Sequence, residues 1–321
     1  MSDPLISVII PSYNHENYVQ EAIRSVIDQT YQNIELIVID DGSKDNTFQK
    51  IKEMESQCQK RFARFSYQTQ ENQGTCTTLN RLLVQANGKY IALIASDDKY
   101  TPNALSDLIN VLEANPAVGL AVGKNLIMDS TGKQCFWDKD RNNVYTQADA
   151  KWLSFDECLS EITETDYFSK DFGTYAKLLK SNHIPNGFLI RKSVLDRIGP
   201  FRKEAPLEDH WLMLQISKYA KMKYIDQPTF YYRWHAANTA KQNDKMKMME
   251  KQTFEWEENY VKSLQDPKWK DLFDSVKYRK ENILNLGFLK IYKQYELNQK
   301  LKILEIFRLK FILKRKIRAR L

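Results

Sequence analysis

Two pairs of neighbouring aspartates, Asp40–Asp41 and Asp97–Asp98, each follow a short apolar run. Carboxylate oxygens are hard ligands that suit Mg²⁺ or Mn²⁺, so Asp97 and Asp98 are candidates for a divalent-cation site. An Asp-Asp pair after a strand can equally form a turn or cap a helix, because aspartate accepts hydrogen bonds from nearby backbone N–H groups. The surrounding sequence is needed to distinguish the metal-binding role from the turn or helix-cap role.

The first 130 residues alternate apolar runs with helical patterns, which is typical of stacked βαβ units and a mostly parallel sheet. The expected strands are residues 6–10, 35–39, 65–69 and 90–95, and the expected helices are residues 18–29, 47–58, a segment between Gly74 and Asn87, and one that Pro102 opens. Every loop after a strand carries polar residues. Because open α/β sheets bind ligands outside the carboxyl ends of their strands, this half is predicted to be a nucleotide-binding scaffold.

The second half is less regular. Residues 118–128 are predicted to form another strand, whereas residues 130–180 are rich in Asp, Lys, Asn and aromatics with weak periodicity and are interpreted as an insertion. A short strand at 188–190, a helix that opens at 207–211 and a late strand at 224–234 follow. Beyond about residue 242 the chain is predicted to be helical and polar, then basic, and it contains no repeats.

The composition favours a cytoplasmic protein. The four cysteines form no Cys-x-x-Cys pair and match no zinc spacing, so they read as reduced thiols. The amino terminus lacks the pattern of a signal peptide. No uninterrupted apolar segment approaches the roughly 18 to 20 residues that span a bilayer.

The net charge of +7 is concentrated at one end of the chain. Residues 301–321 hold eight Lys or Arg and one acid, Glu305, so the other 300 residues are neutral overall. A basic tail on a neutral body suggests that the tail meets an anionic surface, either lipid or nucleic acid.

Three segments in the first half resemble glycosyltransferase family 2, which has the GT-A fold. They are Val8-Ile9-Ile10-Pro11-Ser12-Tyr13-Asn14, then Ile39-Asp40-Asp41-Gly42-Ser43, then Gly88-Lys89-Tyr90-Ile91 leading to Ser96-Asp97-Asp98. The resemblance implies an α/β, GT-A-like, mostly parallel sheet flanked by helices, with a helical C-terminal extension. It also implies a nucleotide-sugar donor, usually a uridine diphosphate sugar. Pro11 and Tyr13 would contact the base, Asp41 the uracil ring and Asp97 the ribose, while Asp98 would bind Mn²⁺ or Mg²⁺.

The resemblance continues in the second half. Pro206-Leu207-Glu208-Asp209 is similar to the family's Glu-Asp motif, which implies that Asp209 is the catalytic base. Alone, the two acids would rather favour a helix N-terminus through its dipole. Tyr232-Arg233-Trp234-His235 looks like a family segment near the diphosphate or metal, so His235 is a second candidate metal ligand, although a lone histidine is more often structural.

The sequence also departs from the family pattern. An acid that many members carry two positions before Asp97 is Ala95 here, which leaves fewer protein ligands for the metal. The family's arginine after Asn72-Gln73-Gly74 is absent from Thr78-Leu79-Asn80. The Gln-x-x-Arg-Trp motif of processive members is missing too, which favours addition of single sugars.

The resulting prediction is an inverting, metal-dependent, non-processive glycosyltransferase of surface polysaccharide synthesis, acting on a glycan or a lipid-linked oligosaccharide. Residues 1–240 are expected to form the GT-A domain, with a nucleotide-sugar half at 1–130 and an acceptor half at 131–240. Residues 241–321 would form a helical basic extension that docks on the anionic inner face of the cytoplasmic membrane, or that caps the fold.

Two other classes of function compete with this prediction. A nucleotidyltransferase would carry a glycine-rich, arginine-bearing loop where this chain has Pro-Ser-Tyr-Asn. A non-catalytic nucleotide-binding or nucleic-acid-binding protein would explain the basic tail but not the ordered acids, so nucleic acid is not expected as a partner.

Overall fold

The computed structural model describes residues 3–277 and divides into two units after Ser263, so residues 3–263 belong to the first unit and 264–277 to the second. Within the second unit the described residues 267–277 are helical. The basic tail at 301–321 lies outside the described residues, and the expected domain boundary after residue 240 stays a prediction.

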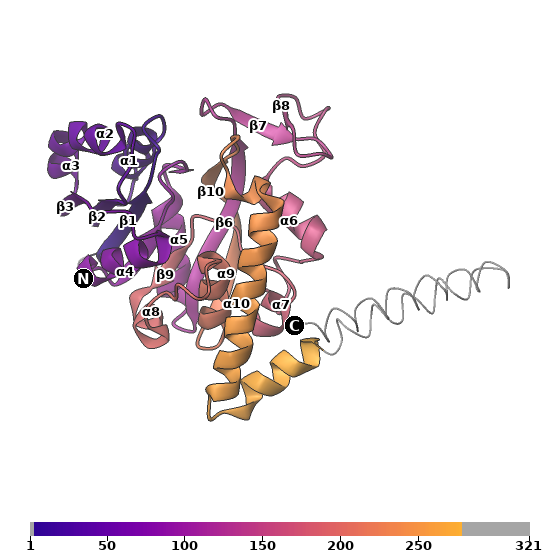
Figure 1. Ribbon diagram of the computed structural model, residues 1–321. Coiled ribbons are helices and arrows are strands. Elements are labelled where there is room, and N and C mark those ends of the chain that lie inside the picture. Colours follow the sequence, from indigo (N-terminus) through magenta and orange to yellow (C-terminus); the bar gives the residue numbers. More distant parts are fainter. Residues whose placement is uncertain (1–2, 278–321) are drawn as a thin grey trace. The chain divides into compact units, whose positions relative to one another are not determined.

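The first unit is built on one sheet (Figure 1), whose path of hydrogen-bonded neighbours is β3-β2-β1-β4-β9-β6-β10-β5, with β7 and β8 as a branch beside β6. Its strands are β1 Ile6–Ser12, β2 Ile34–Asp40, β3 Arg64–Thr69, β4 Tyr90–Leu93, β5 Lys99–Tyr100, β6 Val118–Met128, β7 Gln134–Trp137, β8 Asn143–Val144, β9 Leu189–Arg191 and β10 Lys221–Arg233. Strands β1 to β4 are all parallel, as predicted. The second half is mixed, because β9 runs antiparallel to both β4 and β6.

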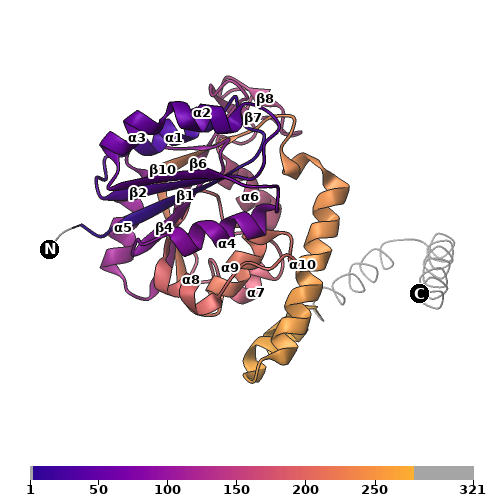
Figure 2. The same cartoon turned by 60° about the vertical axis from the view of Figure 1, so that its left-hand side comes forward.

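Helices cover both faces of this sheet. They are α1 Val19–Ile27, α2 Thr47–Glu53, α3 Glu55–Arg61, α4 Thr75–Gln85, α5 Ala104–Ala114, α6 Phe155–Thr163, α7 Tyr175–Leu178, α8 Lys192–Ile198, α9 Glu208–Ser217 and α10 Asn243–Ser263, with a 3₁₀ turn at Thr239–Lys241. Figure 2 shows α1 to α3 on one side of the parallel strands and α4, α8 and α9 on the other.

Burial explains why the first-half strands could be predicted. Every residue of β2 is buried, as expected for a parallel strand that is covered on both faces. Helix α1 faces the core through Val19, Ala22, Ile23 and Val26, which keep the three-to-four-residue spacing of a helical stripe. The single helix expected at 47–58 is instead two short helices, α2 and α3, joined at Met54.

The segment 130–180 forms a small structured region with its own apolar cluster. Strand β7 pairs with β6, and α6 packs against the same strand. Trp137, Trp152 and Cys158 are buried there against Tyr232 and Trp234 of the β10 region. The periodicity was weak because this core is built from aromatic side chains on short elements rather than from a regular stripe.

Candidate active site

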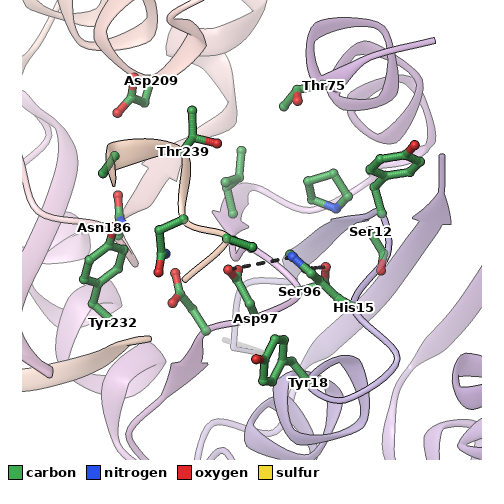
Figure 3. A pocket seen from close by; sticks show the side chains of 18 of the residues that line it. Ser12, His15, Tyr18, Thr75, Ser96, Asp97, Asn186, Asp209, Tyr232 and Thr239 are labelled. Atoms are coloured by element: carbon green, nitrogen blue, oxygen red, sulfur yellow. Dashed lines mark hydrogen bonds and ion pairs between the residues drawn. The ribbon is translucent and has the colours of Figure 1, made fainter. Parts of the chain in front are cut away.

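A cavity of about 790 Å³ opens at the carboxyl ends of the parallel strands. It is lined by all seven residues that the sequence singles out for the site: Pro11, Tyr13, Asp41, Asp97, Asp98, Asp209 and His235. Figure 3 shows Asp209 and Tyr232 on one side of this cavity and Ser12 and His15 on the other. The residues come from the ends of β1, β2, β4 and β10 and from the start of α9, so folding brings together positions from most of the described chain.

The loops after β1 and β2 are joined by hydrogen bonds. Asn14 has a positive φ of 53°, a conformation that asparagine tolerates better than most residues. Its backbone N–H donates to Ser43 Oγ at 2.8 Å, and its side-chain oxygen accepts from the Lys44 N–H at 2.8 Å. Gly42 has a φ of 76°, and a Cβ there would lie 2.8 Å from the backbone nitrogen of Asn72. The Asp-Asp-Gly-Ser loop therefore requires glycine at position 42.

Asp41 is buried and binds the segment that leads into α4. One of its carboxylate oxygens accepts from the Gln70 side chain at 2.6 Å and the Gln73 N–H at 2.9 Å. The other accepts from the Gly74 N–H at 2.8 Å. Asp41 thus shapes one wall of the cavity while keeping free lone-pair directions for a ligand. Tyr13, by contrast, is 44% exposed at the cavity edge, where its ring is accessible for stacking.

Asp97 lies among two histidines. His235 Nε2 is 3.0 Å from Asp97 Oδ2, and His15 Nε2 is 3.9 Å from the same oxygen. One ligand atom from each of the three residues can be chosen so that all lie within 4.8 Å of one another. A mixed oxygen and nitrogen donor set of this size fits a divalent cation. We call these three residues the His15–Asp97–His235 cluster.

The charges in this cluster influence each other. Burial alone would raise the pKa of Asp97, but the hydrogen bond from His235 and the proximity of both histidines leave that pKa below its usual value. Burial lowers the pKa of His15 despite the nearby carboxylate. A charged carboxylate beside a neutral imidazole is the form of both side chains that ligates metals.

Asp98 is not part of the His15–Asp97–His235 cluster. Its Oδ1 accepts from the backbone N–H of Arg233 at 2.8 Å, and the residue is buried. Burial, followed by the charge of Asp97, raises the pKa of Asp98 well above its usual value. Arg233 is itself buried, and its Nε donates to the backbone oxygen of Asp97 at 2.6 Å. The structure therefore places Asp97 in the His15–Asp97–His235 cluster and Asp98 in the contact between the end of β4 and β10.

Two carboxylates from the first turn of α9 reach the cavity from the opposite wall. Asp209 Oδ2 accepts from the Asn182 side chain at 3.1 Å. Burial and the neighbouring Asp209 raise the pKa of Glu208 to about 7. Tyr232 also lines this cavity, and burial, followed by the charges of Asp98, Asp97 and Asp209, raises the pKa of its hydroxyl.

Several cavity residues were not singled out by the sequence analysis, and four of them matter for the site: His15, Tyr18, Ser96 and Lys245. His15 directly follows the Pro-Ser-Tyr-Asn segment, so its place beside that motif could have identified it as a candidate site residue. Lys245 is the one Lys or Arg that lines this cavity among residues 3–277, and it comes from the first turn of α10. Nothing in its local sequence marks it.

The sheet combines the parallel strands β1 to β4 with a mixed second half. Acids lie at the carboxyl ends of the parallel strands, and a candidate base lies across the cavity. This arrangement is that of a GT-A-like fold. Residues 7–199 match the family described as glycosyl transferase family 2. The chain therefore belongs to glycosyl transferase family 2, a family of sugar-transferring enzymes.

Several curated proteins are similar to this chain. An uncharacterized glycosyltransferase of Rickettsia prowazekii is 42% identical over 109 residues, which cover 34% of this chain and 32% of that protein. An uncharacterized glycosyltransferase of Nostoc is 26% identical over 240 residues, covering 73% of this chain and 66% of that protein. The chain spans less than a third of the length of the rickettsial relatives it matches, at 18% and 32% for two of them.

Solved structures share the fold. Residues 1–349 of S. aureus TarS in complex with UDP-GlcNAc match with a TM-score of 0.58 at 17% identity, covering 94% of this chain and 80% of that one. The mannosyltransferase PcManGT from Pyrobaculum calidifontis, in complex with GDP-Man and Mn²⁺, matches with a TM-score of 0.60 at 14% identity, covering 86% and 70%. None of the helices within residues 3–277 is both long and apolar enough to cross a bilayer.

Proposed function

We propose that this protein transfers a sugar from a nucleotide-diphosphate donor to a glycan or a lipid-linked oligosaccharide, in a metal-dependent, inverting and non-processive reaction of surface polysaccharide synthesis. The observation that carries the proposal is the pairing, in one cavity, of the His15–Asp97–His235 cluster with the carboxylate of Asp209. Sugar transfer needs both a cation at the leaving diphosphate and a base at the acceptor hydroxyl.

The donor would lie along the carboxyl ends of β1, β2 and β4. Pro11 and the exposed ring of Tyr13 offer a surface for the base, and Asp41 offers an acceptor for a base N–H. The fold-sharing proteins bind UDP-GlcNAc in one case and GDP-Man in the other. A uridine diphosphate sugar remains our first choice of donor because the resemblance of these loops implies it.

Asp97 and His235 would hold Mn²⁺ or Mg²⁺. The bound cation would stabilise the negative charge that builds up on the leaving diphosphate. We propose Asp97 rather than Asp98 as the carboxylate ligand, because Asp98 is occupied by the Arg233 backbone and lies outside the His15–Asp97–His235 cluster. Asp98 then has the role of fixing the loop that presents Asp97.

Asp209 would take the proton of the acceptor hydroxyl as that oxygen attacks the anomeric carbon and the bond to the diphosphate breaks. One displacement of this kind inverts the anomeric centre. Asn182 holds the Asp209 carboxylate by a hydrogen bond of 3.1 Å, which orients it toward the cavity. Neighbouring Glu208, with a pKa near 7, adds a second proton acceptor at the same wall.

Calorimetric titration of the purified chain with UDP and GDP, with and without Mn²⁺, tests the proposal. We expect one of the two nucleotides to bind with a dissociation constant that falls at least about tenfold when Mn²⁺ is added. If neither nucleotide binds, with or without Mn²⁺, the proposed function is wrong.

We also propose, from the sequence alone, that the basic tail at 301–321 docks the enzyme on an anionic membrane, where a lipid-linked acceptor would be found. Basic residues near such a surface contribute on the order of 1 kcal/mol each. A chain cut after Lys300 should no longer sediment with anionic vesicles at low salt. Equal sedimentation of the cut and full chains would contradict the docking.

A further inference from the structure

His15 is held in place from several directions. It lies in the loop after β1, where its backbone N–H donates to Thr47 Oγ1 at 2.7 Å. Its ring packs edge-on against Tyr18, with 5.8 Å between ring centroids, and against His235, with 6.2 Å. Its Nδ1 lies 2.8 Å from Ser96 Oγ, and Figure 3 shows the ring between Ser96 and Asp97. The side chain is therefore fixed in one orientation.

That orientation turns the other ring nitrogen toward the carboxylate. When Nδ1 carries the proton and donates it to Ser96, the lone pair of Nε2 faces Asp97 Oδ2 at 3.9 Å. A partner on the second nitrogen that fixes tautomer and ring direction is the usual arrangement of metal-binding histidines. Ser96 is therefore placed to fix the tautomer and ring direction of His15.

The spacing of the three side chains suits one cation. Ligands about 2.1 to 2.2 Å from a metal ion are about 3 Å apart when adjacent and about 4.3 Å apart when opposite. The observed 3.0 Å and 3.9 Å contacts to Asp97 lie in that range. The widest separation in the set, at most 4.8 Å, needs a shift of only about half an ångström.

We infer that His15 is a third protein ligand of the cation, so that two imidazoles and one carboxylate select a first-row transition-metal ion such as Mn²⁺ over Mg²⁺. This inference rests on the proposed function and deepens its metal site. Mg²⁺ favours an all-oxygen shell and loses its waters reluctantly, whereas first-row transition-metal ions accept imidazole nitrogen more readily than Mg²⁺ does. Ala95 lines the same cavity and supplies no side-chain oxygen that could ligate the cation.

Pulsed electron paramagnetic resonance on the Mn²⁺-loaded full chain, with UDP or GDP present, counts the directly coupled nitrogens without any assay of activity. We expect two histidine nitrogens in the wild type, and one in each of His15→Ala and His235→Ala. Tyr18→Phe, which keeps the ring beside both histidines, should retain two. Because the wild-type count needs no variant, a variant that fails to fold leaves the test intact.

Affinity gives a second readout. The dissociation constant for Mn²⁺ should rise at least about tenfold in His15→Ala, while that for Mg²⁺ changes less, so the preference for Mn²⁺ shrinks. His15→Gln, with thermal unfolding of the metal-free protein as a check on folding, should behave in the same way. A wild type that binds Mn²⁺ and nucleotide with one nitrogen overturns the role of His15 and leaves the proposed function standing. A wild type that binds neither overturns the proposed function itself.

Discussion

The Asp98 carboxylate accepts a hydrogen bond from the backbone N–H of Arg233 at 2.8 Å, across 135 positions of the chain. This contact joins the loop after β4 to the end of β10. Because Asp97 lies one position from Asp98 and His235 lies two positions from Arg233, the contact also helps to bring Asp97 Oδ2 and His235 Nε2 to 3.0 Å. The proposed cation site therefore depends in part on a buried hydrogen bond that lies outside it.

The two aspartates should respond differently to the same isosteric change. Asp97→Asn removes the charged ligand, so we expect the dissociation constant for Mn²⁺, with nucleotide present, to rise at least about 100-fold. Asp98→Asn keeps an oxygen that can accept from the Arg233 N–H, so its effect should stay below about tenfold. Calorimetry on the two variants checks this. Equal losses of Mn²⁺ affinity in the two variants would indicate that Asp98 is a metal ligand as well.

Asp209→Asn should bind nucleotide and Mn²⁺ as the wild type does but lose turnover by about 10²- to 10⁴-fold, since it cannot take a proton. Glu208→Gln is the matched control on the same helical turn and should lose less. Turnover is followed as nucleotide release with a supplied acceptor. Near wild-type turnover in Asp209→Asn, or a larger loss in Glu208→Gln, would assign the base to Glu208.

Glu208 should also make stability depend on pH. With a folded pKa of about 7 against an ordinary value of 4.5, the folded protein keeps a proton that the unfolded chain releases. Stability should therefore fall as pH rises from about 4.5 to 7, by about 1 to 3 kcal/mol. Urea unfolding at pH 5 and pH 8 measures the difference, and Glu208→Gln should reduce it. An unchanged difference in that variant would show that other groups are responsible.

Lys245 should contact the donor diphosphate. The cavity carries five carboxylates, those of Asp41, Asp97, Asp98, Glu208 and Asp209, and a single lysine among the residues described. Helix α10 is held against the region that follows α9 by a buried ion pair of 2.6 Å between Lys218 and Glu257. Loss of one charged hydrogen bond in Lys245→Ala should weaken binding of UDP or GDP by about 10- to 100-fold.

Two comparisons separate this contact from a general effect on the cavity. The nucleoside without phosphates should bind equally to the wild type and to Lys245→Ala. Lys203→Ala should leave nucleotide affinity unchanged, because Lys203 lines the neighbouring cavity but not this one. Equal weakening of nucleoside and nucleotide would place Lys245 away from the diphosphate.

The sequence predicted the parts of this structure that depend on short-range patterns. Buried strands such as Ile34–Asp40 and the polar loops after them follow from local apolar runs, and the parallel order places those loops at one edge. Which of Asp97 and Asp98 lies beside the two histidines depends instead on the Arg233 backbone, far along the chain. Lys245 reaches the cavity only because α10 packs against α9, which no local pattern encodes.

The most direct test of the central claim is the anomeric configuration of the product, followed by proton magnetic resonance. The enzyme is given Mn²⁺ and an α-linked sugar nucleotide, with water or a short glycan as acceptor. We predict that the new anomeric signal has the β configuration at the earliest time points, before mutarotation, and that it is absent from Asp209→Asn. Initial formation of the α product, or no reaction with any UDP-sugar or GDP-sugar, would contradict a single inverting displacement at this site.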